Sequence, residues 1–306
     1  MLKRTLYFGN PAHLSVQREQ LLIRREGQPE VRTPLEDIGL LVLDDPQITL
    51  TQALLARLMH HNVAVVSCDA RHHPGGLMLP FDGHTTTGGT TRAQVEASQP
   101  LKKQLWKQIV QSKIRNQAAL LERLRRPDPG LRRLAAATLS GDSTNTEAKA
   151  AARYWKQLFP DFLRFSRDPD GPPPNNLLNY GYAILRATVA RALVCSGLWP
   201  ALGLFHRNQY NAFALADDLM EPYRPFVDQV VVGIVRMHGT FLDPMTQGMK
   251  KELLGIPALD VAIGKRQSPL LLAVQSTTAS LAACYAGAKR RLALPAFPET
   301  KGAVVA

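Results

Sequence analysis

The sequence predicts an α+β protein, in which a small β-rich N-terminal domain is joined by a linker to a larger all-α C-terminal domain. Short β-prone runs dominate the first part of the chain, a polar stretch of Thr and Gly follows, and apolar residues then recur at helical spacing. The predicted boundaries are residues 1–84 for the first domain, 85–92 for the linker and 93–306 for the second domain.

Short β-prone runs predict the strands of the N-terminal domain. A Gly-Asn-Pro break at residues 9–11 and a polar turn near Arg18 separate the first of them. Thr49 is the expected N-cap of a helix over residues 50–61. The predicted strands are residues 5–8, 12–17, 20–24, 38–43, 63–67 and 77–81.

The linker is predicted from a stretch of low complexity. Residues 83–91 read GHTTTGGTT, which offers a core no apolar side chain and gives the backbone two adjacent glycines. A segment of this kind is expected to stay outside both domains.

Helical periodicity begins after the linker. Within residues 95–124, apolar positions such as Leu101, Leu105 and Ile109 alternate with lysines and arginines, so one face is expected to be buried and the other basic. The tail from Pro295 is expected to be disordered, and no internal repeat is visible. Further helices are predicted at residues 145–159, 176–197, 208–218, 225–237 and 268–287.

Composition excludes several classes of protein. The 306 residues are 45% hydrophobic and 20% charged, which excludes a disordered chain. No apolar run reaches the roughly 18 residues of a spanning helix, and the apolar start of the chain ends at Gly9, too early for a signal peptide. The three cysteines are an odd number and lie far apart, which fits the reducing cytoplasm and not a disulfide framework.

The net charge of +12 points to a polyanionic partner. Residues 1–90 carry 8 Lys and Arg against 9 Asp and Glu, whereas residues 91–306 carry 29 against 16. If the partner is nucleic acid, the C-terminal part is therefore expected to bind it. Residues 91–133 hold 11 basic and 3 acidic side chains, which a solvated helix face would explain equally well. The candidate DNA-binding side chains are Lys102, Lys103, Lys107, Lys113 and Arg115.

Glu147 is the first candidate for chemistry, and it has a structural alternative. It stands three residues after Thr144, which is the spacing of a capping box. In that arrangement the glutamate would bond back to the backbone N–H of the N-cap and would have no catalytic role.

His206 and the acidic group formed by Asp217, Asp218 and Glu221 are the other candidates. A lone histidine is commonly a surface or a hydrogen-bonded core residue, and acidic residues at a helix end are commonly solvated. Asp217 and Glu221 are four residues apart, however, so they would share one face if the helix continues. Carboxylates near a helix C-terminus oppose its dipole and are unfavourable unless a cation is present.

Two carboxylates and an imidazole in a basic region suit metal-dependent phosphodiester chemistry. Carboxylates bind a hard divalent ion, and one imidazole among them favours Mg²⁺ or Mn²⁺. The ion polarises the phosphate, and the surrounding cations hold the nucleic-acid backbone.

At these residues the sequence resembles the family of CRISPR-associated protein one, and most closely its type II branch. The resemblance rests on NYGYAIL at residues 179–185, GLWPALG at 197–203, His206, and NAFALADDLMEPYRP at 211–225. The β-rich start and helical remainder also match the layout of that family. The resemblance implies a metal-dependent DNA endonuclease and integrase that inserts short foreign DNA segments into a CRISPR array.

The resemblance also implies roles for individual residues and partners. Glu147, His206 and Glu221 would be the metal ligands, although many members have aspartate at the last position, and Asp218 would be a second, more variable acidic position. A 3′-hydroxyl of the captured DNA would attack a phosphodiester at the edge of the repeat. The family forms a homodimer that joins CRISPR-associated protein two, and a type II system can add its effector nuclease. The weakly charged N-terminal domain is expected to mediate dimerisation.

Other functions remain open at this point. The chain could be a DNA-binding scaffold without catalysis, or a simple metal-dependent nuclease that uses water as nucleophile. A zinc site in the first domain is a further alternative, although zinc commonly takes cysteines in closely spaced pairs and only one is present there. Its candidate ligands are His60, His61, Cys68, His72, His73 and His84.

Overall fold

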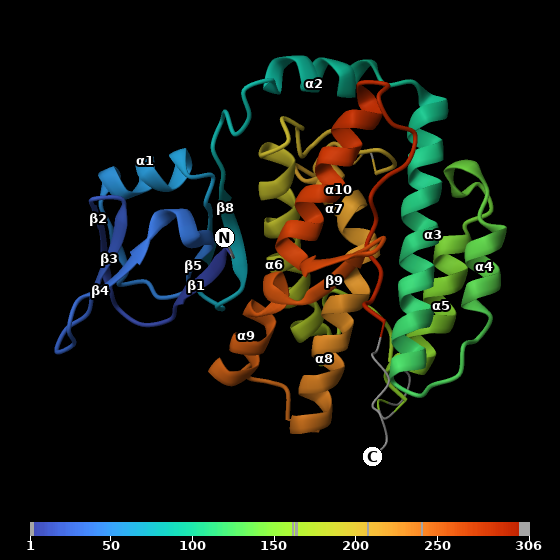
Figure 1. Ribbon diagram of the computed structural model, residues 1–306. Coiled ribbons are helices and arrows are strands. Elements are labelled where there is room, and N and C mark those ends of the chain that lie inside the picture. Colours follow the sequence, from blue (N-terminus) through green and yellow to red (C-terminus); the bar gives the residue numbers. More distant parts are fainter. Residues whose placement is uncertain (1–2, 161, 163–164, 207, 240, 300–306) are drawn as a thin grey trace.

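A computed structural model describes residues 3–160, 162, 165–206, 208–239 and 241–299. Its β-rich N-terminal part lies beside a larger helical part (Figure 1), so the predicted α+β class is confirmed. No helix among the described residues is long and apolar enough to cross a membrane.

Two four-stranded sheets and one helix form the N-terminal domain. Sheet A has the order β1-β5-β7-β8, in which only β8 runs antiparallel to its neighbour. Sheet B has the order β4-β3-β2-β6. The elements are β1 (Arg4–Phe8), β2 (His13–Gln17), β3 (Gln20–Arg24), β4 (Val31–Pro34), β5 (Ile38–Leu43), β6 (Thr49–Leu50), α1 (Gln52–His60), β7 (Ala64–Cys68) and β8 (Pro74–Met78).

Sheet A is apolar on both faces and joins the two parts of the molecule. Leu40 and Val42 of β5, with Ala64 and Val66 of β7, belong to the same apolar cluster as the helices. Leu41 lies between Leu40 and Val42 and points to the opposite face of the sheet, because successive side chains of a strand alternate between its two faces. There it belongs to a second apolar cluster, which includes residues of sheet B and α1. The predicted domains therefore share a core.

Polar contacts reinforce this junction. The ammonium of Lys250, on α9, donates to Asp44 Oδ2 at 2.7 Å just after β5, and both side chains are buried. Arg191 of α6 donates to the carbonyl of Asn62 at 2.6 Å.

The C-terminal domain is mainly helical. Most of α6 is buried, and α7, α8, α9 and α10 all contact it. A short antiparallel pair, β9 and β10, adds a small sheet to this otherwise helical part. The elements are α2 (Thr87–Glu96), α3 (Gln99–Arg123), α4 (Leu131–Ala137), α5 (Thr146–Leu158), α6 (Asn175–Val194), α7 (Ala214–Met220), α8 (Arg224–His238), α9 (Gln247–Leu254), β9 (Asp260–Ile263), β10 (Arg266–Pro269) and α10 (Leu270–Tyr285).

The predicted linker is largely helical. Residues 87–92 lie inside α2, and Gln94 of the same helix is buried with its side chain bonded to both backbone groups of Trp199. Tertiary contacts thus order a sequence that has little helix propensity of its own. The single helix predicted over residues 95–124 is interrupted before α3, where Ser98 Oγ accepts from the backbone N–H of Leu101.

Three further expectations need correction. Thr49 belongs to β6, and Thr51 caps α1 by accepting from the N–H of Leu54. The tail is ordered as far as the described residues reach, because Ala296 bridges to Ala262 of β9; residues 300–306 lie outside them. The predicted helix at 208–218 begins only at Ala214. Sequence reasoning also missed β4, α4, α9 and the β9–β10 pair.

Candidate active site and basic groove

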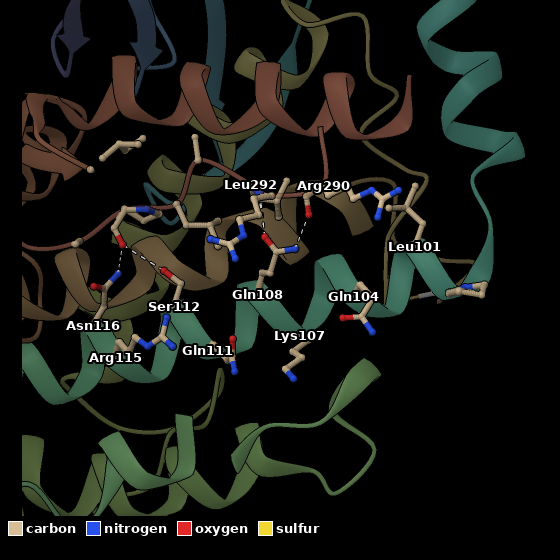
Figure 2. A pocket seen from close by; sticks show the side chains of 18 of the residues that line it. Leu101, Gln104, Lys107, Gln108, Gln111, Ser112, Arg115, Asn116, Arg290 and Leu292 are labelled. Atoms are coloured by element: carbon tan, nitrogen blue, oxygen red, sulfur yellow. Dashed lines mark hydrogen bonds between the residues drawn. The ribbon is translucent and has the colours of Figure 1, made fainter. Parts of the chain in front are cut away.

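One side of α3 borders a basic groove. The groove has a volume of about 1240 Å³ and lies between α3 and the extended segment that follows α10 (Figure 2). Gln108 holds the two walls together, because its side chain donates to the carbonyl of Arg290 at 3.1 Å and accepts from the N–H of Leu292 at 2.9 Å. The basic lining residues are Lys107, Arg115, Arg290 and Arg291.

The predicted DNA-binding side chains divide between the two sides of α3. Lys107 and Arg115 line the groove, whereas Lys102 and Lys103 are not among its lining residues. Lys113 differs from the expectation of an exposed basic face, because its side chain is 11% exposed and is enclosed with carboxylates. At about 100° per residue it lies close to Trp106, seven positions earlier, on the side of α3 away from the groove.

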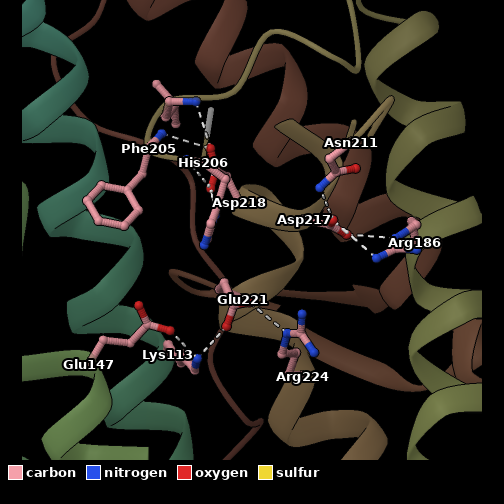
Figure 3. A network of polar contacts seen from close by, with 11 residues as sticks. Lys113, Glu147, Arg186, Phe205, His206, Asn211, Asp217, Asp218, Glu221 and Arg224 are labelled. Atoms are coloured by element: carbon pink, nitrogen blue, oxygen red, sulfur yellow. Dashed lines mark hydrogen bonds and ion pairs between the residues drawn. The ribbon is translucent and has the colours of Figure 1, made fainter. Parts of the chain in front are cut away.

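Lys113 brings two of the predicted site residues together (Figure 3). Its Nζ lies 2.5 Å from Glu147 Oε1 and also pairs with Glu221 Oε2. Burial lowers the pKa of Lys113, but the two carboxylates outweigh burial and raise it. Carboxylates 74 positions apart in the sequence thus converge on one ammonium.

Glu147 is not the glutamate of a capping box. Asp142 caps α5 instead, accepting from the N–H of Thr146 at 2.8 Å and from that of Glu147 at 3.0 Å. The hydroxyl of Thr144 lies 2.9 Å from that of Thr146 and does not cap the helix. The Glu147 side chain is therefore available to the site at the first turn of α5.

Glu221 lies in a short 3₁₀ turn between α7 and α8, and its side chain is only 7% exposed. Arg224 Nε donates to Glu221 Oε1 at 2.8 Å. Burial raises the pKa of Glu221, but Arg224 and Lys113 outweigh burial and lower it to about 2. Glu221 is therefore an anion at any pH near neutrality.

Arg224 also contacts an aromatic ring in addition to Glu221. Its guanidinium lies 4.5 Å from the centre of the Tyr182 ring, and the Tyr182 hydroxyl donates to the buried Asp228 at 2.5 Å. The Tyr154 hydroxyl donates to the other oxygen of Asp228 at 2.7 Å. These contacts with Tyr182, and through it with Asp228, fix the position of Arg224. Arg224 in turn fixes Glu221.

Asp218 positions His206. Asp218 is fully buried in α7, and its Oδ1 lies 2.5 Å from His206 Nδ1. Its Oδ2 accepts from the backbone N–H groups of Leu204 and Phe205 at 2.6 and 2.9 Å. The bond to Asp218 uses Nδ1, so Nε2 is the ring nitrogen that a metal or phosphate would engage.

Three carboxylates act on the pKa of His206. The hydrogen bond to Asp218 raises the pKa of His206, burial opposes that shift, and the charges of Glu221 and Glu147 raise the pKa further. The loop can approach Asp218 this closely because position 203 is glycine. A Cβ on Gly203 would lie 2.3 Å from the His206 carbonyl oxygen and 3.0 Å from Asp218 Oδ2.

Asp217 takes no part in this arrangement. Arg186 of α6 donates to its two oxygens at 2.7 and 3.1 Å, and the Asn211 side chain donates to it at 2.8 Å. The sequence places Asp217 and Glu221 on one helix face, but the structure separates them (Figure 3). Asp217 pairs with Arg186 of α6, whereas Glu221 pairs with Lys113 of α3.

An aromatic pair that sequence reasoning missed adjoins His206. The Phe205 ring stacks on the buried Trp106 with centroids 4.5 Å apart, and Phe205 is 47% exposed. The rings of Trp106 and His206 also meet nearly at a right angle, with centroids 5.7 Å apart. The phenylalanine directly before the candidate histidine is the sequence signal that could have revealed this pair.

The donor set suits a hard divalent cation, although its members are not gathered as a finished site. Among the described residues, no three His, Cys, Asp or Glu side chains stand together as a metal-binding group. Glu221 Oε2 is buried and has no hydrogen bond of good geometry in this part of the chain, its contact being the ion pair with Lys113. Glu147 and Glu221 thus present oxygens to one cation, and the charges of both carboxylates act on His206.

The histidines of the alternative zinc site have separate contacts. His61 pairs with Glu19 at 2.8 Å and His72 with Asp44 at 2.9 Å. His84 bonds to the Thr86 hydroxyl at 3.0 Å.

Known proteins resemble the chain over most of its length. Residues 6–240 match the family model described as CRISPR associated protein Cas1. A CRISPR-associated endonuclease Cas1 of Neisseria meningitidis serogroup C (strain 8013) is 38% identical over 285 residues, which cover 92% of each chain.

Two solved structures share the fold. A casposase bound to integration product has a TM-score of 0.76 at 20% identity and covers 95% of this chain and 92% of its own. A chain of a Cas6-RT-Cas1–Cas2 complex has a TM-score of 0.71 at 20% identity, covering 95% of this chain and 36% of its own.

Proposed function

The chain belongs to the Cas1 family of CRISPR-associated proteins, and we propose that it is a divalent-metal-dependent integrase and endonuclease that inserts short DNA segments into a CRISPR array. One observation carries the proposal. Glu147 and Glu221, from distant parts of the chain, converge on a single buried cation beside a histidine that Asp218 orients.

Glu147, Glu221 and His206 would hold Mg²⁺ or Mn²⁺. When bound, the ion would polarise the scissile phosphate and stabilise the departing oxygen. Arg224 keeps Glu221 ionised and oriented, and Asp218 keeps the His206 Nδ1 position occupied so that Nε2 is the ligand atom.

The reaction is a transesterification. The 3′-oxygen of the captured DNA loses its proton to water and forms a new bond to phosphorus at the edge of the repeat. The bond from that phosphorus to the repeat's 3′-oxygen breaks, and this oxygen takes up a proton from water. The number of phosphodiester bonds is conserved, so no external energy source is needed. The chain contributes binding and orientation, with the stacked Phe205 forming a wall next to His206.

The basic groove supplies phosphate contacts for double-stranded DNA. Lys107 and Arg115 from α3 face Arg290 and Arg291 from the segment after α10, and all four line the same groove. Such contacts position DNA without reading its sequence. Lys102 and Lys103 would extend the basic surface beyond it.

The partners belong to the proposal as well. The resemblance to type II members suggests a homodimer, the companion Cas2 protein and a type II effector nuclease. In support, a chain of similar fold is part of a complex that includes Cas2.

The test is incubation of the protein with a short duplex and a supercoiled plasmid bearing the repeat, with and without Mn²⁺. Covalent joining of duplex to plasmid that depends on Mn²⁺ is expected. Cleavage without joining would indicate a nuclease that uses water, and binding without any Mn²⁺-dependent reaction would indicate a scaffold.

A further inference from the structure

Lys113 is an unusual residue to find at a metal-binding position. Its ammonium is buried between two carboxylates, one of which it contacts at 2.5 Å. With Arg224, it balances the charges of Glu147 and Glu221, so the enclosed cluster of four side chains is neutral. Buried charges are stable only when paired in this way.

The geometry of the pairing resembles that of a bridging cation. A lysine ammonium is a compact point charge, unlike the planar fork of arginine, and it is carried on a flexible four-carbon stem. It can therefore lie between two carboxylate oxygens, as a small metal ion does, and can also swing away. Arg224 instead binds Glu221 from the far side, on a different oxygen.

Without Lys113 the two carboxylates would repel each other. Glu147 is fixed at the start of α5 and Glu221 in the turn before α8, so only a cation between them favours their close approach. A divalent ion and the ammonium would compete for the same oxygens, since both cannot occupy one position.

We propose that Lys113 is a built-in counter-cation. It occupies the place between Glu147 and Glu221 while no divalent ion is bound, keeps the carboxylates converged, and is displaced when the ion enters. The inference rests on the metal site proposed above. It predicts that Lys113 lowers the affinity for the ion while stabilising the metal-free protein.

The test compares two substitutions that each remove one lysine charge. Lys113→Met keeps an unbranched chain of similar length, and Lys149→Met is the matched control, an exposed lysine two positions beyond Glu147. Mn²⁺ binding is measured by calorimetry at fixed pH, and the Tm is measured in EDTA and in saturating Mn²⁺.

For Lys113→Met we expect Mn²⁺ binding at least about tenfold tighter than in the unmodified protein. Its Tm should fall in EDTA and rise more on adding Mn²⁺ than that of the unmodified protein, since binding to the folded state stabilises it. Lys149→Met should leave both quantities unchanged. Wild-type or weaker Mn²⁺ affinity in a folded Lys113→Met protein would overturn the inference.

A second variant covers the case in which Lys113→Met does not fold. Lys113→Arg keeps the charge but can bind both carboxylates in a fixed fork, so Mn²⁺ binding should be at least about tenfold weaker while the Tm in EDTA is maintained. Unchanged Mn²⁺ affinity in Lys113→Arg would also contradict the inference.

Glu147→Gln separates this inference from the proposed function. If Mn²⁺ binds the unmodified protein and Glu147→Gln equally well, the metal site itself is wrong. If Glu147→Gln loses Mn²⁺ while both Lys113 variants behave as the unmodified protein, only the role of Lys113 is wrong.

Discussion

Asp218 Oδ1 lies 2.5 Å from His206 Nδ1, and the same carboxylate binds the two backbone N–H groups that precede His206. One fully buried aspartate therefore sets both the path of the loop and the orientation of the ring. The relationship makes Asp218 a positioning residue for His206.

Asp218→Asn should lower the pKa of His206. The asparagine oxygen replaces only one of the two carboxylate oxygens that accept hydrogen bonds, and the negative charge that favours the imidazolium is lost. An NMR titration of the metal-free protein should show the His206 midpoint at lower pH. An unchanged midpoint would contradict the assignment of Asp218 as the main cause.

The same pKa shift has a consequence for stability. Because the pKa of folded His206 is raised, its pairing with Asp218 stabilises the fold fully below the unfolded value of about 6.5. That contribution is lost as pH rises through the folded value. Denaturant unfolding across this range should show the decline in the unmodified protein and a flatter profile in Asp218→Asn.

Glu147→Gln should reduce Mn²⁺-dependent integration by at least about a hundredfold. The change removes an anionic oxygen that a hard ion needs, while Asp142 still caps α5. The Tm in EDTA should stay within a few degrees, since Lys113 keeps its contact with Glu221. Integration assays and thermal melts measure both, and wild-type integration would exclude Glu147 as a ligand.

His206→Ala should abolish integration but preserve the binding of duplex DNA. The ring lies beside Trp106, whereas the groove occupies the other side of α3. Fluorescence anisotropy with a labelled duplex, alongside the plasmid-joining assay, distinguishes the two effects. Retained integration would remove His206 from the site.

Replacing both Arg115 and Arg291 by glutamine should weaken DNA binding and flatten its salt dependence. Each lost phosphate contact reduces the slope of log K against log salt by about 0.9. The control is the double variant Arg32→Gln with Arg71→Gln, which removes the same charge from the N-terminal domain. It should change the slope far less. Equal slopes for the two double variants would show that the groove does not hold DNA.

Local patterns were sufficient to predict part of the fold and to select the candidate residues of the site. The strands over residues 20–24 and 38–43 match residue for residue, because each is an apolar run that ends at polar or charged residues. The sequence identifies Glu147, His206 and Glu221 as candidates by their chemistry, and only His206 and Glu221 lie in the motif at residues 179–225.

Other features depend on tertiary contacts that no local pattern encodes. The helix over residues 87–96 is ordered by the loop around Trp199, more than a hundred positions away. The charge pattern places Lys113 on the basic face, yet this residue lies seven positions after the buried Trp106. A lysine on the apolar side of an amphipathic helix is the signal that could have revealed its role.

The apolar faces of sheet A have a consequence for how the protein melts. Because β5 and β7 contribute to both hydrophobic clusters, neither part can lose its structure without exposing apolar surface of the other. Calorimetry should therefore show one cooperative transition with a single enthalpy, instead of separate peaks for the two parts. A fragment that begins at Ala93 would leave the sheet-facing side of α6 uncovered and is expected to aggregate.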